Sequence, residues 1–348
     1  MKRILHLVGA RPNFMKIAPV MAKIAEKCPA FEQILVHTGQ HYDERMSAVF
    51  FDELDLPKPN VNLEVGSGSH ASQTAEIMKR FEPVLLHYRP DWLLVPGDVN
   101  STIAGALVAA KAGIHVAHLE AGVRSFDRSM PEEINRVVTD HISDLLLTPT
   151  EDAERNLLRE GVSREKIHFV GNAAIDSLKR LLPKAASRWP RWHAELGRAP
   201  FVLVTLHRPE NVDNEQRLSA FMTTFHNLAE HAMVVFPVHP RTRSHLLRLG
   251  YLPTKQNGLR LIEPEGYLDF IALQAHAALV ITDSGGVQAE STFLRVPCLT
   301  VRPNTEWVVT LSSGTNTLVS DFGPSHVPEC LWHMANGKNL AGKEGPLR

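Results

Sequence analysis

An alternation that runs along the chain is the strongest constraint on its fold. Short apolar runs are followed, again and again, by stretches with helical spacing of their apolar residues. This pattern predicts strand–helix repeats and a parallel sheet with helices on both faces. In the first half the predicted strands are Ile4–Val8, Ile34–Thr38, Trp92–Pro96, His115–Leu119, Leu145–Thr148 and Ile167–Val170. They predict one complete doubly wound α/β domain.

The pattern stops once and then restarts. Residues 178–200 combine basic residues with prolines and break the rhythm, which predicts a domain junction. The strands predicted after it are Val202–Thr205, Val234–Val238, Leu259–Ile262, Leu279–Thr282 and Cys298–Val301. We therefore expect two Rossmann-like domains, residues 1–177 and residues 178–348, with a cleft between them.

The composition limits the classes of partner. The net charge of −1 leaves no basic excess for binding nucleic acid or an anionic membrane. Cys28, Cys298 and Cys330 form no CxxC pair, and their odd number argues against a disulfide framework. The apolar run at the start is too short for a signal peptide, and no run approaches the roughly 20 residues of a spanning helix. We expect a cytoplasmic protein.

The segment GARPNFMK, residues 9–16, directly follows the first predicted strand. Its backbone amides, Arg11 and Lys16 are expected at the carboxyl edge of the sheet, where they suit a diphosphate. The alternative is a plain strand–helix turn in which Arg11 makes a surface ion pair.

Acidic residues follow other predicted strands of the first domain. Asp98 lies in PGDVNST, Glu120 in HLEAGVRS, and the pair Glu132 and Glu133 in MPEEINR, one helical turn before Arg136. Each acid has an ordinary structural explanation: Asp98 as a turn residue, Glu120 as a partner of Arg124, and Glu132 as a helix N-terminal charge. Several carboxylates at one sheet edge nevertheless predict proton transfer.

Two histidines follow strands in the second domain. His207 lies in TLHRPEN and His239 in VHPRT. Their sequence spacing is not that of metal ligands, so we expect no metal site.

The segment TDSGGVQAE, residues 282–290, predicts a strand followed by a helix whose first-turn amides bind phosphate. Gly285 and Gly286 carry no side chains that would hold a diphosphate away, and Glu290 lies about one turn later, where its carboxylate suits ribose hydroxyls. The alternative is a glycine-rich connector in which Ser284 caps the helix.

Eight segments, in this order along nearly the whole chain, carry a family resemblance. They are GARPNFMK, GDVNST, HLEAGVRS, PEEINR, HRPEN, VHPRT, TDSGGVQAE and RPNTEW. Together they resemble the non-hydrolysing UDP-N-acetylglucosamine 2-epimerases. The resemblance implies a glycosyltransferase-B-like architecture, a UDP-sugar substrate, a homodimer, and a role in polysaccharide biosynthesis. It also implies a reaction without cofactor, in which UDP is eliminated to leave 2-acetamidoglucal and then adds back after inversion at C2.

The resemblance assigns site residues by position. It implies catalytic roles for Asp98, Glu120, Glu132, His207 and Lys16. It implies substrate-binding roles for Arg11, Arg136, His239, Tyr267, Ser284, Gly285, Gly286, Glu290 and Arg302.

The chain departs from the family pattern in four places. Some relatives are activated by a second substrate molecule and carry a second glutamine near the positions of Gln40 and His41. This chain has Gln40 and His41 but lacks that second glutamine, so we expect no such activation. Ala289 replaces an acid before Glu290, and Trp307 with Val308 replaces Arg-Pro. Relatives usually continue past the position of GKEGPLR, residues 342–348, into a helix that returns to the first domain, so weaker domain closure is expected.

Three other functions fit parts of the pattern. A hydrolysing epimerase would release free N-acetylmannosamine, a glycosyltransferase would need an acceptor groove, and a binding protein would hold UDP without exchanging the C2 proton. The sugar substituents at C3 and C6 are left open by the sequence.

Overall fold

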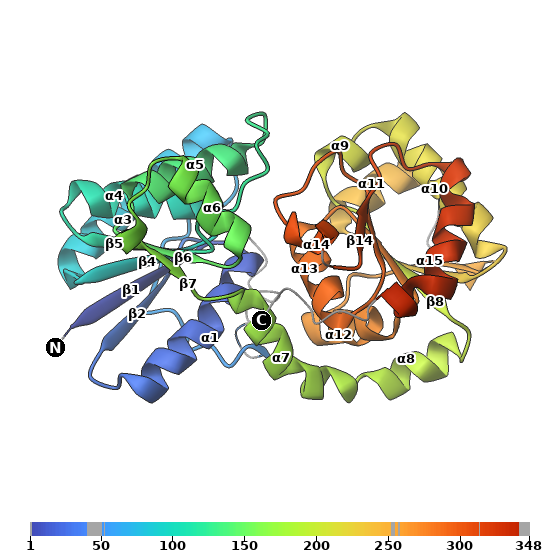
Figure 1. Cartoon of the computed structure of the whole chain (residues 1–348), viewed down its shortest axis with the longest axis horizontal. Coiled ribbons are helices and arrows are strands. Elements are labelled where there is room, and N and C mark those ends of the chain that lie inside the picture. Colours follow the sequence, from blue (N-terminus) through green and yellow to red (C-terminus); the bar gives the residue numbers. More distant parts are fainter. Residues whose placement is uncertain are drawn as a thin grey trace. The chain divides into compact units, whose positions relative to one another are not determined.

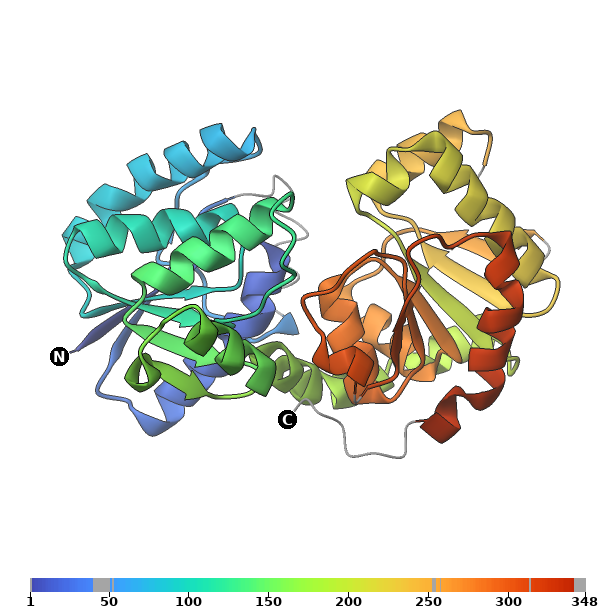
Figure 2. The ribbon, with the colours of Figure 1, turned by 45° about the horizontal axis from the view of Figure 1, so that its top comes forward.

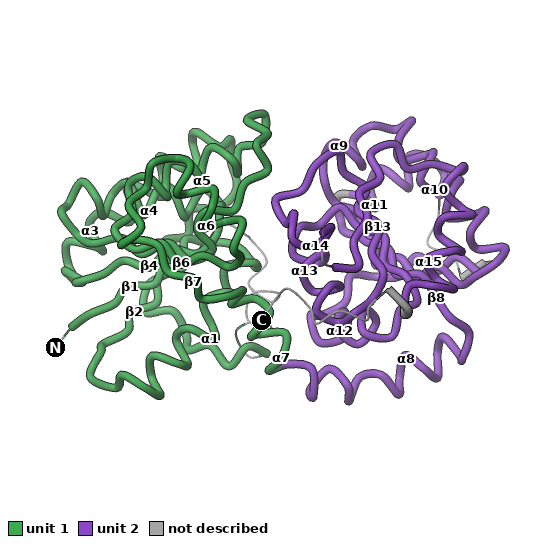
Figure 3. Tube along the Cα trace, viewed as in Figure 1, with its two compact units in different colours: residues 1–180 green, residues 181–348 purple. Residues whose placement is uncertain are grey.

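The computed structural model describes residues 2–39, 51, 53–251, 255–256, 258–312 and 314–340. It divides into two compact units, residues 1–180 and 181–348 (Figure 3). The division falls inside helix α7 (Ala173–Ala186), the same helix that contains the expected junction after residue 177.

The first unit is built around a seven-stranded parallel sheet in the order β3-β2-β1-β4-β5-β6-β7. Its strands are β1 (Arg3–Val8), β2 (Glu32–His37), β3 (Val61–Asn62), β4 (Trp92–Pro96), β5 (His115–Leu119), β6 (Leu145–Thr148) and β7 (Ile167–Phe169). Its helices, besides α7, are α1 (Arg11–Lys27), α3 (His70–Tyr88), α4 (Asn100–Lys111), α5 (Pro131–Ile142), α6 (Glu151–Arg159) and the 3₁₀ turn η1 (Arg164–Lys166). Helices α3, α4 and α5 lie side by side over one face, and α1 covers the other (Figures 1 and 2).

The second unit repeats this plan with the sheet order β10-β11-β9-β8-β12-β13-β14. Its strands are β8 (Phe201–Thr205), β9 (Met233–Pro237), β10 (Lys255–Gln256), β11 (Leu259–Ile262), β12 (Leu279–Thr282), β13 (Cys298–Thr300) and β14 (Asn316–Leu318). Among the strands described, β10 alone pairs antiparallel. Its helices are α8 (Trp189–Leu196), α9 (Pro209–Val212), α10 (Glu215–Ala229), α11 (Pro240–Arg248), α12 (Tyr267–His276), α13 (Gly285–Leu294), α14 (Val309–Ser312), η2 (Pro324–His326) and α15 (Val327–Leu340).

Each sheet is buried between apolar helix faces. In the first unit, Leu5, Leu7 and Val95 of the sheet pack with Phe81 of α3 and Ala106 of α4. In the second unit, α10 and α15 cover one face, and α8, α12 and α13 cover the other. The predicted fold class, two α/β units with doubly wound sheets, is confirmed.

The segment expected to break the pattern is helical. Residues 178–200 contain the end of α7 and all of α8. Pro190 stands at the start of α8, where a missing amide proton costs no hydrogen bond, so the proline starts this helix.

Candidate active site

The order of the first sheet defines where a site can form. Strands β1 and β4 are neighbours, and the connections after them lead to helices on opposite faces of the sheet. In doubly wound sheets this switch point is where a ligand crevice forms. Asn13, in the first turn of α1, joins the two loops: its Oδ1 accepts hydrogen bonds from the amides of Gly9 (3.0 Å) and Ala10 (3.1 Å), and its Nδ2 donates to the Pro96 carbonyl (2.9 Å). These two amides, expected at a diphosphate, are satisfied by Asn13 instead.

Lys16 and Glu120 form an ion pair beside this crevice. Lys16 Nζ lies 2.6 Å from Glu120 Oε1, and each side chain is 11% exposed. The alternative pairing of Glu120 with Arg124 is wrong, because Arg124 binds Asp140 and Glu160.

The backbone of Glu120 is strained, with a φ of 75°. A non-glycine residue in this region costs about 1–3 kcal/mol and persists only where the surroundings enforce it. Here the amides of Glu120 and Ala121 both donate to the Leu147 carbonyl, which holds the turn and therefore the direction of the carboxylate. Strain of this kind clusters at functional sites.

Asp98 faces a guanidinium. Arg136 Nη2 and Nε lie 2.5 Å and 3.0 Å from Asp98 Oδ2, and Asn135 Nδ2 donates to the Asp98 carbonyl (2.8 Å). Both partners lie on α5, so this helix fixes the side chain and the backbone of Asp98 together.

The environments of the two carboxyls move their pKa values in opposite directions. Burial alone would raise the pKa of Asp98, but Arg136 and Lys16 outweigh it and hold this pKa below its usual value. Burial raises the pKa of Glu120, the nearby charge of Asp98 adds to that effect, and Lys16 opposes it. Such a pair provides one carboxylate that stays ionised and one that is closer to accepting a proton.

The two acids at the start of α5 have different surroundings. Glu133 is buried and accepts hydrogen bonds from Ser125 and Phe126 and from Arg136 Nη1 (2.8 Å). Glu132 is half-buried in the first turn, and the structure gives it no hydrogen bond or ion pair within the described residues. Glu133, the second acid of the predicted pair, therefore holds the loop before α5 and orients Arg136.

The corresponding switch point of the second sheet lies between the ends of β8 and β12. Asp283, fully buried, accepts hydrogen bonds from the amides of His207 (3.1 Å to Oδ2) and Arg208 (3.0 Å) and from Asn211 Nδ2 (3.0 Å). His207 Nδ1 lies 2.9 Å from Asp283 Oδ1, while the ring of His207 is 44% exposed. Asp283 thus orients an accessible imidazole; it was not selected from the sequence, although it directly follows a strand in TDSGG.

Helix α13 begins at Gly285, with Ser284 at the N-cap position, but the Ser284 hydroxyl makes no capping hydrogen bond. The alternative interpretation thus has the N-cap position of this serine right, but its side chain does not satisfy an amide of the helix. Gly286 is exposed and open, whereas a Cβ at Gly285 would lie 2.3 Å from Glu306 Oε1. Packing against Glu306 thus gives a second reason for glycine at 285.

Three further predicted binding residues are buried near α13. Tyr267 donates from its hydroxyl to Glu290 Oε1 (2.7 Å), so α12 and α13 hold this carboxylate between them. Arg302, directly after β13 and Val301, lies 2.8 Å from Glu306 through its Nη2.

The last two predicted residues are exposed. Arg11 is in the first turn of α1, and His239 follows β9 and Val238 with its ring centroid 6.4 Å from that of His207. The structure thus brings Lys16, Asp98, Glu120 and Arg136 together in the first unit, and His207 with His239 in the second.

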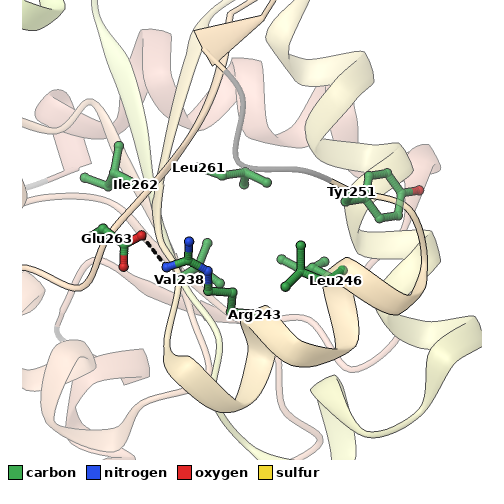
Figure 4. A pocket seen from close by; sticks show the side chains of 8 residues that line it. Val238, Arg243, Leu246, Tyr251, Leu261, Ile262 and Glu263 are labelled. Carbon is green, nitrogen blue, oxygen red and sulfur yellow. Dashed lines mark hydrogen bonds and ion pairs between the residues drawn. The ribbon is translucent and has the colours of Figure 1, made fainter.

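A separate hollow lies in the second unit between α11 and the ends of β9 and β11 (Figure 4). Its walls are apolar, apart from an ion pair between Arg243 and Glu263. It contains none of the predicted site residues.

Two predictions lie outside the described residues: those on Gln40 and His41, and the one on the chain after residue 340. Across the described ranges, no three histidine, cysteine or acidic side chains are grouped as metal ligands would be. The helices found in those ranges include none with the length and apolar character of a membrane span.

Comparison with known proteins gives consistent matches. The family model described as UDP-N-acetylglucosamine 2-epimerase matches residues 23–343. A UDP-N-acetylglucosamine 2-epimerase homolog of Methanococcus maripaludis is 49% identical over 91% of this chain and 88% of its own length. The UDP-2,3-diacetamido-2,3-dideoxy-D-glucuronate 2-epimerase of Pseudomonas aeruginosa is 43% identical, over 91% and 88%. The crystal structure of Methanocaldococcus jannaschii UDP-GlcNAc 2-epimerase with UDP-GlcNAc and UDP is similar with a TM-score of 0.90 and 41% identity, over 99% of this chain and 96% of that one.

Proposed function

The chain belongs to the UDP-N-acetylglucosamine 2-epimerase family, and from this premise we propose that it interconverts UDP-N-acetylglucosamine and UDP-N-acetylmannosamine without hydrolysis. A carboxylate removes the proton from C2 while the C1–O bond breaks and UDP leaves with the electron pair. The resulting 2-acetamidoglucal receives a proton on the opposite face of C2 as a UDP oxygen re-forms the bond to C1. No atom is oxidised or reduced overall, so the reaction needs no hydride carrier.

The observation that carries this proposal is the pair of carboxyls at the β1–β4 crevice. Asp98 and Glu120 have pKa values displaced in opposite directions, and each contacts a cation. Inversion at C2 needs a proton acceptor and a proton donor, and a pair of this kind supplies both. We assign the C2 proton steps to Asp98 and Glu120, and we assign assistance to C1–O cleavage to Glu132.

The leaving group carries negative charge, which positive side chains and oriented amides stabilise. Lys16 and Arg136 are assigned to the charge that develops during cleavage, and Arg11, His207 and His239 to the diphosphate. The open turn at Ser284, Gly285 and Gly286 is assigned to the same diphosphate, since helix α13 directs its first amides there. Glu290 is assigned to the ribose, Tyr267 to the uridine side, and Arg302 to support of this region.

Product analysis tests the proposal. The purified chain is incubated with UDP-N-acetylglucosamine, and nucleotide sugars are separated from free sugars by anion exchange. Formation of UDP-N-acetylmannosamine, with no free N-acetylmannosamine, supports non-hydrolytic epimerisation. Stoichiometric release of UDP and free N-acetylmannosamine would instead establish the hydrolysing reaction.

The relative from Pseudomonas aeruginosa, by its name, acts on a sugar altered at C3 and C6. The same assay with UDP-2,3-diacetamido-2,3-dideoxy-D-glucuronate decides between the two substrates by their kcat/KM values. The homodimer, the cytoplasmic location and the role in polysaccharide biosynthesis stay predictions.

A further inference from the structure

A buried histidine lies behind the Asp98 turn. His118, in β5, is fully buried, and both of its ring nitrogens have oxygen partners. Its Nδ1 lies 2.6 Å from Asp140 Oδ1, and its Nε2 lies 2.7 Å from the Gly97 carbonyl oxygen. Neither His118 nor Asp140 was selected from the sequence, and neither has a role in the proposed function.

The chemistry of the two partners fixes the protons on the ring. A carbonyl oxygen only accepts hydrogen bonds, so Nε2 must carry a proton. The other oxygen of Asp140 accepts from the Gly122 amide (3.0 Å) and lies 2.7 Å from Arg124 Nη2. The Arg124 guanidinium and the Gly122 amide both stabilise the ionised form of this carboxyl group. Asp140 is therefore an ionised acceptor, and Nδ1 must also donate.

Asp140 is the carboxylate that faces the ring from α5, and Arg124 and Glu160 continue the chain of charges beyond it. On the opposite side of the ring lies the Gly97–Asp98 turn after β4. Among the groups that lower the pKa of Asp98 against burial, His118 acts together with Arg136 and Lys16.

Both backbone polar groups of Gly97 are hydrogen-bonded. Its amide donates to the Leu119 carbonyl (2.9 Å), and its carbonyl accepts from His118, while its φ is 67°. The position of Asp98, the next residue, follows from this turn.

Resting on the function proposed above, we propose that His118 is a positioning residue for the epimerase reaction. As an imidazolium held by Asp140, it fixes the Gly97–Asp98 turn through its Nε2–H bond and places a buried positive charge behind Asp98. Asp140 supplies the orientation and the counter-charge, which is the role of the third group in many acid–base sites.

The ring protons are tested first, in the wild-type chain and independently of activity. With ¹⁵N-histidine labelling, one-bond ¹H–¹⁵N signals from both ring nitrogens are expected for His118, identified among the 18 histidines by their loss in His118→Leu. His6 is an internal comparison, because burial lowers its pKa to about 4 and its ring stays neutral near pH 7. A His118 ring with a single proton near pH 7 would overturn the proposal.

Kinetics test the positioning role. His118→Leu is expected to lower kcat by roughly 10–100-fold with little change in KM, because displacement of a reacting group by about 1 Å has an effect of this size. His118→Gln keeps a neutral donor near the Nε2 position and should recover part of that loss. His6→Gln, in another buried histidine of the same sheet, is the matched control and should keep the wild-type kcat.

The outcomes separate the two proposals. If the wild-type chain turns over its substrate and His118→Leu, shown to be folded by its thermal unfolding, keeps the wild-type kcat, the positioning role is refuted. If the wild-type chain turns over no nucleotide sugar, the proposed function fails, while the NMR result still reports the protons on His118.

Discussion

Asp283 provides the sharpest test of how the second unit is organised. Replacing it with asparagine keeps the shape of the side chain but removes its charge and turns one acceptor oxygen into a donor. In the wild type both oxygens accept, from the His207 and Arg208 amides, Asn211 Nδ2 and the His207 ring. In Asp283→Asn the new amide nitrogen can only donate, so the His207 ring loses its charged partner and the amides and Asn211 are left bonded to a neutral oxygen.

The size of the effect follows from this geometry. Hydrogen bonds to a charged group contribute about 1.5–3 kcal/mol each, against about 1 kcal/mol for neutral ones. Weakening three bonds by about 0.5–2 kcal/mol each gives a loss of roughly 2–6 kcal/mol. That is a large part of the stability of an ordinary domain, about 5–15 kcal/mol.

The pH dependence gives a second measure. His207 and Asn211 outweigh burial and hold the pKa of Asp283 below its usual value, so its contribution is present above the unfolded pKa of about 3.9 and is lost as pH falls through the folded pKa. At pH values below the unfolded pKa of about 3.9, the difference in the free energy of unfolding between the wild type and Asp283→Asn should therefore become smaller.

The assay is urea unfolding followed by tryptophan fluorescence. Four of the five tryptophans are in the second unit, namely Trp189, Trp192, Trp307 and Trp332. Asp321→Asn, an exposed acid of the same unit, is the control and should change the free energy of unfolding by less than about 0.5 kcal/mol. A loss below about 1 kcal/mol in Asp283→Asn would refute the claim that this carboxylate organises the His207 loop.

Three other predictions concern activity. Asp98→Asn, Glu120→Gln and Glu132→Gln should each lower turnover by roughly a hundredfold or more, and near-normal kcat in any of them would reject that assignment. Gly97→Ala would put a Cβ 2.7 Å from Lys16 Nζ, so it should lower kcat about 10-fold or more. Gly113→Ala is the control, because Gly113 has a similar φ but open space around it, and this change should lower only the stability of the protein. Equal kcat values in the two variants would contradict the prediction. Tyr267→Phe removes the hydrogen bond to Glu290 and should weaken UDP binding about 10-fold, as measured by calorimetry. Tyr251→Phe is the control and should bind UDP as the wild type does. Unchanged affinity in Tyr267→Phe would show that Tyr267 does not orient Glu290 for UDP binding.

The periodic parts of the fold were predictable from the sequence. Strands such as β4 and β8 are continuous apolar runs buried on both faces, and their predicted bounds lie close to those observed. Strands β3 and β14 are short and include polar residues, so their pairing depends on the neighbouring strand and not on local pattern. Helices α7 and α8 were missed because prolines there suggested a break, although both tolerate them.

The candidate site was predictable where residues follow strands. Glu120 and Asp98 were found in this way, but their partners were not paired correctly, because Lys16 lies 104 positions from Glu120 in sequence. Asp283 and His118 were missed, and Glu133 was predicted only as the neighbour of Glu132, because each acts through backbone groups of a loop. A sequence does not show which backbone group a side chain will meet. For Glu133 one signal was present: its spacing of three residues from Arg136 in a predicted helix.

The most direct test of the central claim is proton NMR of the full chain with UDP-N-acetylglucosamine in deuterium oxide. The account predicts UDP-N-acetylmannosamine that carries deuterium at C2, because the proton removed from one face is replaced from solvent-equilibrated carboxyls on the other. A substrate that stays unchanged and undeuterated while UDP still binds would contradict the claim that these carboxylates perform proton transfer at C2.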